Sequence, residues 1–194
     1  MRYFLSVAAF LFILPGAYAQ KTPEGLFINS KAPDFRAKDQ SGLEIHLKSL
    51  LKKGKVVLLF YQGQWSPYCN NELRRFNDSL QQIIAKGATL VAVTPEKPES
   101  IMKTIEKTSA SFSILSDEGL KIMKAYDVAY EVDENTLTRY RNTGINLEGN
   151  NGKNGNFLPV PATYIIDKES TITYRYFEPN FKKRPSIKEI LQNL

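Results

Sequence analysis

Several short segments of the chain are apolar at every position, and each predicts a buried strand. Residues 56–61 (V-V-L-L-F-Y) form the longest such run, and residues 89–93, apolar after Thr89, predict a second buried strand. A strand without polar positions is typical of a parallel sheet that helices cover on both faces. Further strands are predicted at 43–47, where apolar and polar residues alternate, and at 113–115, 162–166 and 171–176.

Helical spacing of apolar residues appears between these strands. After 56–61, apolar side chains recur at i, i+3, i+7, i+10 and i+11, which predicts one long helix that Gly87 ends. These positions are Leu73, Phe76, Leu80, Ile83 and Ile84. Shorter helices are predicted at 100–108, at 120–126 behind the candidate N-cap Asp117, and at 185–193. Residues 127–158 show no period and end in Gly and Asn, so we expect an irregular loop.

Strands that alternate with helices and then a terminal hairpin at 162–176 predict an α/β fold with a central mixed β-sheet flanked by helices. The sequence contains neither repeats nor a linker long enough to divide it. We therefore expect one domain over residues 20–194, a length that can bury a substantial core.

The first 19 residues have the pattern of a secretory signal peptide. Arg2 supplies a positive charge, residues 3–14 are apolar, and Ala17 and Ala19 are small residues at the positions that a signal peptidase recognises. The apolar run is shorter than the roughly 20 residues that span a bilayer. We therefore expect an exported protein that is periplasmic or secreted, without a membrane segment after cleavage.

Composition narrows the possible chemistry. The formal net charge is +6, but the basic residues are dispersed and form no module typical of nucleic-acid binding. One Cys permits neither an internal disulfide nor a Cys-x-x-Cys pair. With a single His, His46, a Cys/His zinc site is also excluded, and we expect neither a metal nor a cofactor. His46 lies on an alternating segment and is expected to face solvent. Any redox chemistry must use Cys69.

Cys69 follows the 56–61 strand in the segment Trp65-Ser66-Pro67-Tyr68-Cys69. Ser66 is a favoured N-cap and Pro67 suits the first helical position, so Cys69 falls in the first turn of a helix. Unpaired N–H groups and the helix dipole at that end favour a thiolate, which predicts a pKa below that of free cysteine. The Ser66 hydroxyl can cap the helix and also point its proton at the sulfur.

Two interpretations of Cys69 remain open. The end of a central strand is a surface crevice in open α/β folds, which favours a reactive thiol. Free cysteine is also among the most buried residue types, which favours an inert one. In either case Trp65 and Tyr68 are expected to form the wall and rim of the crevice.

Four segments together resemble the thioredoxin-like superfamily. They are Ala32-Pro33-Asp34-Phe35, the strand 56–61, W-S-P-Y-C at 65–69, and V-P-A-T-Y-I-I-D at 160–167. In order and spacing they are most similar to the peroxiredoxin-like branch, the alkyl hydroperoxide reductase/thiol-specific antioxidant family. The resemblance covers residues 27–194.

The resemblance implies specific roles and also shows departures from the family pattern. Cys69 would be the peroxidatic cysteine, with Ser66 in place of the family's Thr. Pro161 would be the cis-proline beside the sulfur. Gln62, however, replaces the Pro of the pattern, and Pro161 stands where peroxiredoxins have an Arg that supports the thiolate. The candidates to replace that Arg are Arg74, Arg75, Arg139 and Arg141.

Three functions follow from these residues. The first is a thiol-dependent peroxidase, an antioxidant oxidoreductase that reduces hydroperoxides at one cysteine and is recycled by an external thiol or a thioredoxin-like partner. The second is monothiol thiol–disulfide exchange, in which nothing in the chain can resolve the mixed disulfide. The third is a non-catalytic redoxin-fold module that binds a partner through the crevice and the 127–158 loop.

Overall fold

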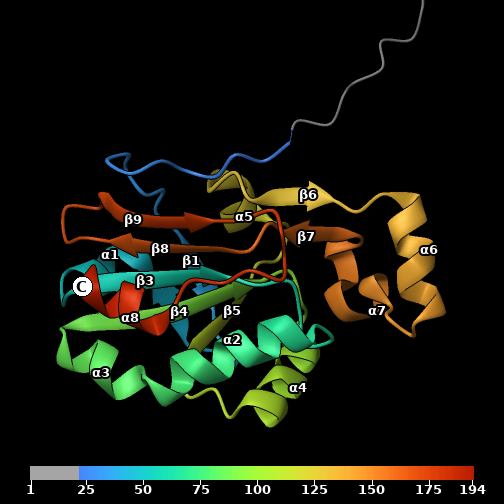
Figure 1. The fold of residues 1–194 in the computed structure, drawn as a ribbon, viewed down its shortest axis with the longest axis horizontal. Helices are drawn as coiled ribbons and strands as arrows, with labels where there is room; N and C mark the ends of the chain where they lie inside the picture. The colour runs from blue at the N-terminus through green and yellow to red at the C-terminus, as the bar shows by residue number, and fades with distance from the viewer. Residues whose placement is uncertain (1–21) are drawn as a thin grey trace, which may run out of the picture.

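A computed structural model describes residues 22–194, so the predicted signal peptide at 1–19 lies outside the described residues. Its centre is a five-stranded sheet in the order β5-β4-β3-β8-β9 (Figure 1). The strands are β3 (Lys55–Phe60), β4 (Ala88–Thr94), β5 (Ser113–Ser116), β8 (Ala162–Ile166) and β9 (Ile172–Phe177). β3, β4 and β5 run parallel, whereas β8 and β9 form an antiparallel hairpin beside β3. The predicted mixed α/β sheet and terminal hairpin are confirmed.

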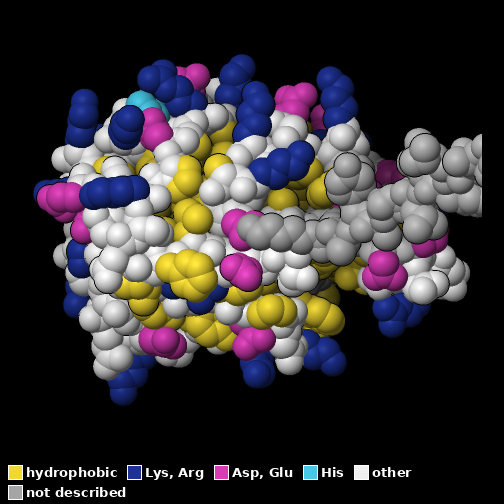
Figure 2. All heavy atoms as spheres, turned by 90° about the horizontal axis from the view of Figure 1, so that it is seen from above, with side chains coloured by type: hydrophobic (Ala, Val, Ile, Leu, Met, Phe, Trp, Pro, Cys, Tyr) yellow, Lys and Arg dark blue, Asp and Glu magenta, His cyan; other side chains and the backbone are white. Residues whose placement is uncertain are grey.

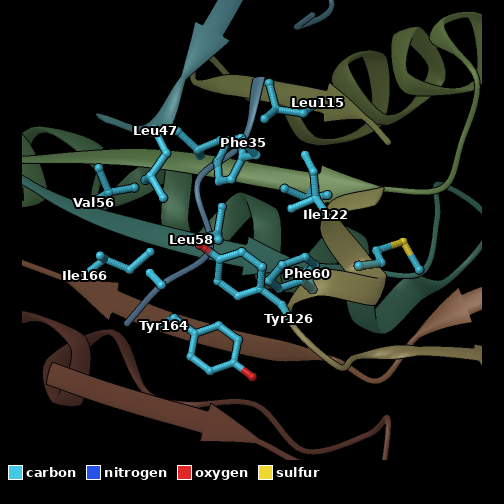
Figure 3. Close-up of a cluster of buried hydrophobic side chains, with 14 of the residues drawn as sticks. Phe35, Leu47, Val56, Leu58, Phe60, Leu115, Ile122, Tyr126, Tyr164 and Ile166 are labelled. Atoms are coloured by element: carbon cyan, nitrogen blue, oxygen red, sulfur yellow. The ribbon is translucent and has the colours of Figure 1, made fainter. Parts of the chain in front are cut away.

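Alternate residues of β3 enter two separate cores, which explains why the strand is apolar throughout. Val56, Leu58 and Phe60 join α1 (Leu47–Leu51) and α5 (Lys121–Ala125) on one face (Figure 3). Val57 and Leu59 join the helices of the other face. Those helices are α2 (Pro67–Asp78), α3 (Leu80–Ala85), α4 (Pro98–Thr108) and α8 (Ile187–Gln192).

The predicted long helix is divided in two at Ser79, so the expectation of one continuous helix is wrong. Ser79 leaves the helical conformation at φ −103° and ψ 5°. The break follows Asn77 and Asp78, polar residues whose side chains compete for backbone hydrogen bonds and so have low helix propensity. The Asn77 side chain instead accepts a hydrogen bond from the backbone N–H of Ser111, at 2.9 Å.

Asp117 supports the start of α5, although it is not the residue directly before the helix. Its two carboxylate oxygens accept hydrogen bonds from the N–H groups of Ile122 and Met123, at 3.0 and 2.7 Å. The residue before the helix is Leu120, in the left-handed conformation. The predicted capping interaction therefore exists, three residues further from the helix than a standard N-cap.

Residues 127–158 form an ordered unit rather than the predicted irregular loop. They contain β6 (Ala129–Glu131), α6 (Glu134–Asn142), α7 (Leu147–Asn151), a 3-10 turn η1 (Gly152–Asn154) and β7 (Phe157–Pro159), and β6 pairs with β7. A small core holds them together, made of Val132, Leu137, Leu147 and Leu158. Each element is short and contributes only one or two apolar residues, too few for a period to be visible in the sequence.

A second two-stranded sheet joins β1 (Arg36–Lys38) to β2 (Glu44–His46). His46 is less exposed than predicted: its side chain is 19% exposed, and its Nε2 lies 2.9 Å from a carboxylate oxygen of Asp34.

On the face drawn in Figure 2, Lys and Arg side chains are interspersed with Asp and Glu. No helix within residues 22–194 has both the length and the apolar character needed to cross a bilayer.

Candidate active site

Cys69 lies in the first turn of α2, directly after the carboxyl end of β3, as the sequence predicts. Ser66 is the N-cap and its Oγ accepts a hydrogen bond from the Cys69 N–H at 3.3 Å. Pro67 occupies the first helical position, where its missing N–H leaves no gap in the hydrogen bonding. The Ser66 hydroxyl and the Gln62 backbone N–H also act on the Cys69 thiol and lower its pKa.

The prediction that Cys69 faces a surface crevice is wrong, because the side chain is fully buried. The segment between β9 and α8 packs against the start of α2. Phe181 contacts the Tyr68 ring at 5.7 Å between centroids, and Arg75 donates to the Pro185 carbonyl at 2.6 Å. Arg184 of this segment has its Nη2 3.7 Å from the sulfur.

The predicted low thiol pKa is also wrong. Burial raises the pKa of Cys69 above its ordinary value, and the negative charge of Glu72 adds to this effect. Arg184, Ser66 and Gln62 act in the opposite direction but do not outweigh burial. The helix terminus alone favours the thiolate, but removing the sulfur from water costs more in this fold.

Arg184 forms a buried ion pair with Glu72, one turn after Cys69 on α2. The Nε to Oε2 distance is 2.5 Å, and the two side chains are 6% and 2% exposed. Burial lowers the pKa of Arg184, but the neighbouring Glu72 carboxylate outweighs it and raises that pKa overall. The site therefore holds a guanidinium that contacts both a carboxylate and the Cys69 sulfur.

None of the four arginines expected to supply this guanidinium does so. Arg74 donates to the Lys107 carbonyl, Arg75 to Pro185, Arg139 to the Thr136 hydroxyl and Arg141 to Glu134. Arg184 was missed because it lies 115 positions from Cys69, in a basic run that looks like surface charge. One signal was available: Glu72 lies on the apolar face of α2, and a buried carboxylate requires a partner.

Pro161 is buried directly before β8, but the expected cis peptide is absent, as residues 22–194 contain no cis bond. Pro161 lines a cavity of about 360 Å³ together with Gln62, Tyr130, Val160 and Pro179. The Gln62 side chain donates to the Tyr130 hydroxyl at 3.1 Å. Because Gln62 lines this cavity and its backbone N–H also lowers the pKa of Cys69, the cavity adjoins the surroundings of the thiol. Sequence reasoning missed Tyr130, which lies on β6 of the unit then expected to be irregular.

Trp65 and Tyr68 have separate roles. Tyr68 is 39% exposed and lies at the surface beside Phe181. Trp65 instead packs against the 127–158 unit, with its ring centroid 5.1 Å from that of Tyr140. Tyr68 is therefore exposed as expected, but among the described residues it borders no crevice that opens on Cys69, and Trp65 connects the Cys69 loop to the inserted unit.

Gln62 shows how this site departs from the pattern it resembles. A proline at this position would have no N–H, whereas Gln62 offers one to the sulfur. Its side chain, 3% exposed, adds the bond to Tyr130. The substitution therefore adds a donor to the sulfur and a link to the inserted unit.

Comparison with known proteins identifies the family. Residues 28–175 match the model of the AhpC/TSA family. A Helicobacter pylori protein named "Putative peroxiredoxin bcp" is 39% identical over 171 residues, which cover 88% of this chain and 99% of that protein.

Two solved structures share the fold at low identity. Peroxidoxin BcpB from Mycobacterium tuberculosis gives a TM-score of 0.62 at 21% identity, covering 77% of this chain and 84% of that one. The yeast mitochondrial 1-Cys peroxiredoxin gives a TM-score of 0.67 at 20% identity, and the match covers 86% of this chain and 73% of that one. The family match, the bcp relative and the cysteine at the start of α2 agree: the chain belongs to the AhpC/TSA family and is a peroxiredoxin of the thioredoxin-like superfamily.

Proposed function

We propose that this protein reduces hydroperoxides at Cys69 and that the Arg184 guanidinium, with the Ser66 hydroxyl and the Gln62 N–H, supports the reacting sulfur. The observation that supports this most is the 3.7 Å contact between Arg184 Nη2 and the sulfur inside a buried site. Hydrogen bonds to a charged group are about twice as strong as those between neutral groups, so these donors favour the thiolate that must form before the reaction.

The reaction transfers one oxygen atom to sulfur. The Cys69 thiolate attacks the terminal oxygen of the hydroperoxide, an S–O bond forms and the O–O bond breaks. Sulfur loses two electrons and becomes a sulfenic acid, while the departing alkoxide or hydroxide takes a proton and leaves as an alcohol or water. The cavity beside Gln62 and Pro161 is a route by which a small hydroperoxide could reach the site.

Two external thiol groups complete the cycle, because Cys69 is the only cysteine in the sequence. The first thiol condenses with the sulfenic acid, which forms a mixed disulfide and releases water. The second attacks that disulfide and returns the Cys69 thiol. A yeast relative is described as resolving its thiol through glutathione/thioredoxin systems, and we propose a reductant of that class here.

We also propose that the protein is exported. The support is the charge and apolar pattern of residues 1–19. The intact mass of the protein recovered from the native cells tests this: a chain that begins at Gln20 is expected, and a chain that retains residues 1–19 contradicts export by cleavage.

The test of the activity follows the single thiol. Residues 20–194 are treated with less than one equivalent of hydrogen peroxide, and sulfenic acid is trapped while loss of free thiol is timed. Cys69 is expected to react faster than free cysteine, more so as pH rises toward the thiol pKa, and Cys69→Ser is expected to lose all reaction. A rate no greater than that of free cysteine contradicts the proposal. Rapid adduct formation with glutathione disulfide instead would favour thiol–disulfide exchange.

A further inference from the structure

Glu96 is a fully buried carboxyl group that the reaction described above does not use. It lies between β4 and α4, at the carboxyl end of the strand beside β3. Within residues 22–194 no Lys, Arg or His forms an ion pair with it. Burial of a carboxyl without a counter-ion is costly, so its position calls for an explanation.

The Glu96 side chain binds the loop that leads to Cys69. Oε1 accepts a hydrogen bond from the Gln64 N–H at 3.0 Å, and Oε2 accepts one from the Thr104 hydroxyl at 3.4 Å. The backbone of Glu96 is itself fixed, since its carbonyl accepts from the Ser116 hydroxyl at 2.7 Å. Glu96 therefore connects the loop to β5 and α4, two rigid elements of the domain.

The carbonyl of Gln64 is held as firmly as its N–H. Asn70, next to Cys69 on α2, donates to it at 2.9 Å, and the Lys107 ammonium donates to it at 3.2 Å. Gly63 passes so close to the carboxyl that an added Cβ would lie 2.8 Å from Glu96 Oε1. The loop is thus closely fitted around Glu96 at Gly63 and Gln64.

The same loop carries two groups that act on the Cys69 thiol. Gln62 and Ser66, on either side of Gly63 and Gln64, both lower the pKa of Cys69, and Ser66 Oγ accepts from the Cys69 N–H at 3.3 Å. A shift of the peptide at Gln64 would therefore displace both groups together. Since donor positions that differ by a fraction of an ångström change a reaction rate substantially, the anchor of this loop bears directly on the reaction.

We propose that Glu96 is a positioning residue for Cys69: its carboxylate holds the Gln64 peptide so that Gln62 and Ser66 stay directed at the sulfur, and its protonation weakens that hold. The inference rests on the proposed function of Cys69. When protonated, the carboxyl still accepts from Gln64, but the bond no longer has an ionised acceptor. The Thr104 hydroxyl then has to accept rather than donate.

The surroundings of Glu96 permit this change near neutral pH. Burial raises its pKa to about 7, against the hydrogen bonds from Gln64 and Thr104 and the charges of Lys107 and Lys103. A further titratable group that faces it is Tyr61, directly after β3, whose hydroxyl lies 3.3 Å from the Thr104 hydroxyl. Both protonation states of Glu96 are therefore populated at physiological pH.

The test compares Glu96→Gln with the control Glu99→Gln. Glu99 is an exposed glutamate in the first turn of α4, and its substitution removes the same charge. Glutamine keeps the shape of Glu96, accepts from Gln64 and donates to Thr104, but it is neutral at every pH. The rate of the Cys69 reaction with hydrogen peroxide is measured between pH 5.5 and 8.5. At pH 8.5, E96Q is expected to be about tenfold slower than wild type, while at pH 5.5 the two rates converge. E99Q is expected to follow wild type throughout.

A merely structural role predicts something different. If Glu96 only stabilises the fold, E96Q loses stability and rate in parallel, and the ratio of the two rates does not depend on pH. If it positions the loop, E96Q is at least as thermally stable as wild type at pH 8.5 and still slower. A ratio independent of pH overturns the proposal.

Two further measurements keep the test decisive. Alkylation of Cys69 by iodoacetamide over the same pH range reports on the thiol even if the protein does not reduce peroxides, so the proposed function and the role of Glu96 fail separately. Thr104→Val removes one donor to the carboxylate, so the pH at which the rate changes is expected to move upward. An unchanged midpoint in T104V would contradict titration of Glu96 as the cause.

Discussion

Glu72 and Glu96 are both buried beside the Cys69 loop, but they have different partners. Glu72 forms an ion pair with Arg184, whereas within residues 22–194 the Glu96 carboxylate accepts hydrogen bonds from the neutral Gln64 N–H and Thr104 hydroxyl and forms no ion pair. Burial raises the pKa of each to about 7, despite the guanidinium beside Glu72. Removal from water is therefore the larger effect at both sites. The two carboxyl groups differ in how they connect to the Cys69 sulfur. Glu72 binds Arg184, which contacts the sulfur, whereas Glu96 binds Gln64 in the loop that leads to Cys69.

The largest effect is expected for Arg184→Ala, which removes the ion pair that distinguishes Glu72 from Glu96. It leaves Glu72 buried without a partner, which costs about 3–5 kcal/mol of unfolding free energy. It also removes the guanidinium from the sulfur, so the peroxide rate is expected to fall by about a hundredfold. Urea unfolding and single-turnover kinetics measure the two effects. Lys183→Ala is the control. The Lys183 ammonium forms a surface ion pair with Glu178, so its loss should change the unfolding free energy and the peroxide rate little.

A double variant separates stability from reactivity at the same pair. Replacing both Glu72 and Arg184 by leucine removes two buried charges at once, and such replacements are often neutral or stabilising. The unfolding free energy is therefore expected to recover most of the R184A loss, while the peroxide rate stays low. Recovery of the rate together with stability would show that the pair acts only through the fold.

The pH dependence of stability sharpens the comparison between the two glutamates. A raised native pKa means that the folded state holds these protons more tightly than the unfolded chain, whose carboxyl groups titrate near 4.5. The contribution of these two groups to stability is therefore greatest below about pH 4.5 and falls as pH rises to about 7; for Glu96 the change is at most about 3.5 kcal/mol, at roughly 1.4 kcal/mol for each pKa unit. E96Q is expected to flatten this decline and to be more stable than wild type at pH 8.

Glu72→Gln is expected to differ at the same pH, because it leaves the buried Arg184 without its carboxylate. Its unfolding free energy at pH 8 should therefore be lower than that of wild type. Thermal unfolding at pH 5, 6.5 and 8 measures both variants. If E72Q and E96Q changed the thermal stability at pH 8 in the same direction and by the same amount, the distinction between a paired and an unpaired carboxyl group would be contradicted.

The smallest effect is expected for Phe181→Ala, at the surface over Cys69. Its ring is 41% exposed and contacts Tyr68, an interaction worth about 0.5–1.5 kcal/mol, so the loss of stability should be of that size. Removing the ring loosens the segment that carries Arg184, so alkylation of Cys69 should become a few times faster. Leu43→Ala, which is also exposed, is the control. An unchanged alkylation rate would show that Phe181 does not limit access to the thiol.

Local sequence predicted the parts of the site that depend on neighbouring residues. The apolar run at 56–61 predicted β3, and Ser66 with Pro67 predicted where α2 begins. Both signals depend on contacts within a few positions: a strand alternates between two faces, and a cap satisfies the N–H groups of the first turn. The order of these signals was also enough to predict the mixed sheet.

Predictions that depended on distant residues failed. The exposure and pKa of Cys69 were wrong because the segment before α8 covers α2, and no local pattern shows that contact. The 127–158 unit was missed because its core takes one or two residues from each short element. Pro161 was expected to be cis by resemblance, and the described chain has no cis bond.

The sequence by itself determined that one cysteine, at the start of a helix after a buried strand, must perform any thiol chemistry, since composition and helix capping are local properties. Only the tertiary structure decided the charge around that thiol. Arg184 lies 115 positions from Cys69, and Gln64 binds a carboxyl group 32 positions away. Solvation and Coulomb interactions depend on distance in space, so the pKa of a buried group is decided by whichever segments pack around it.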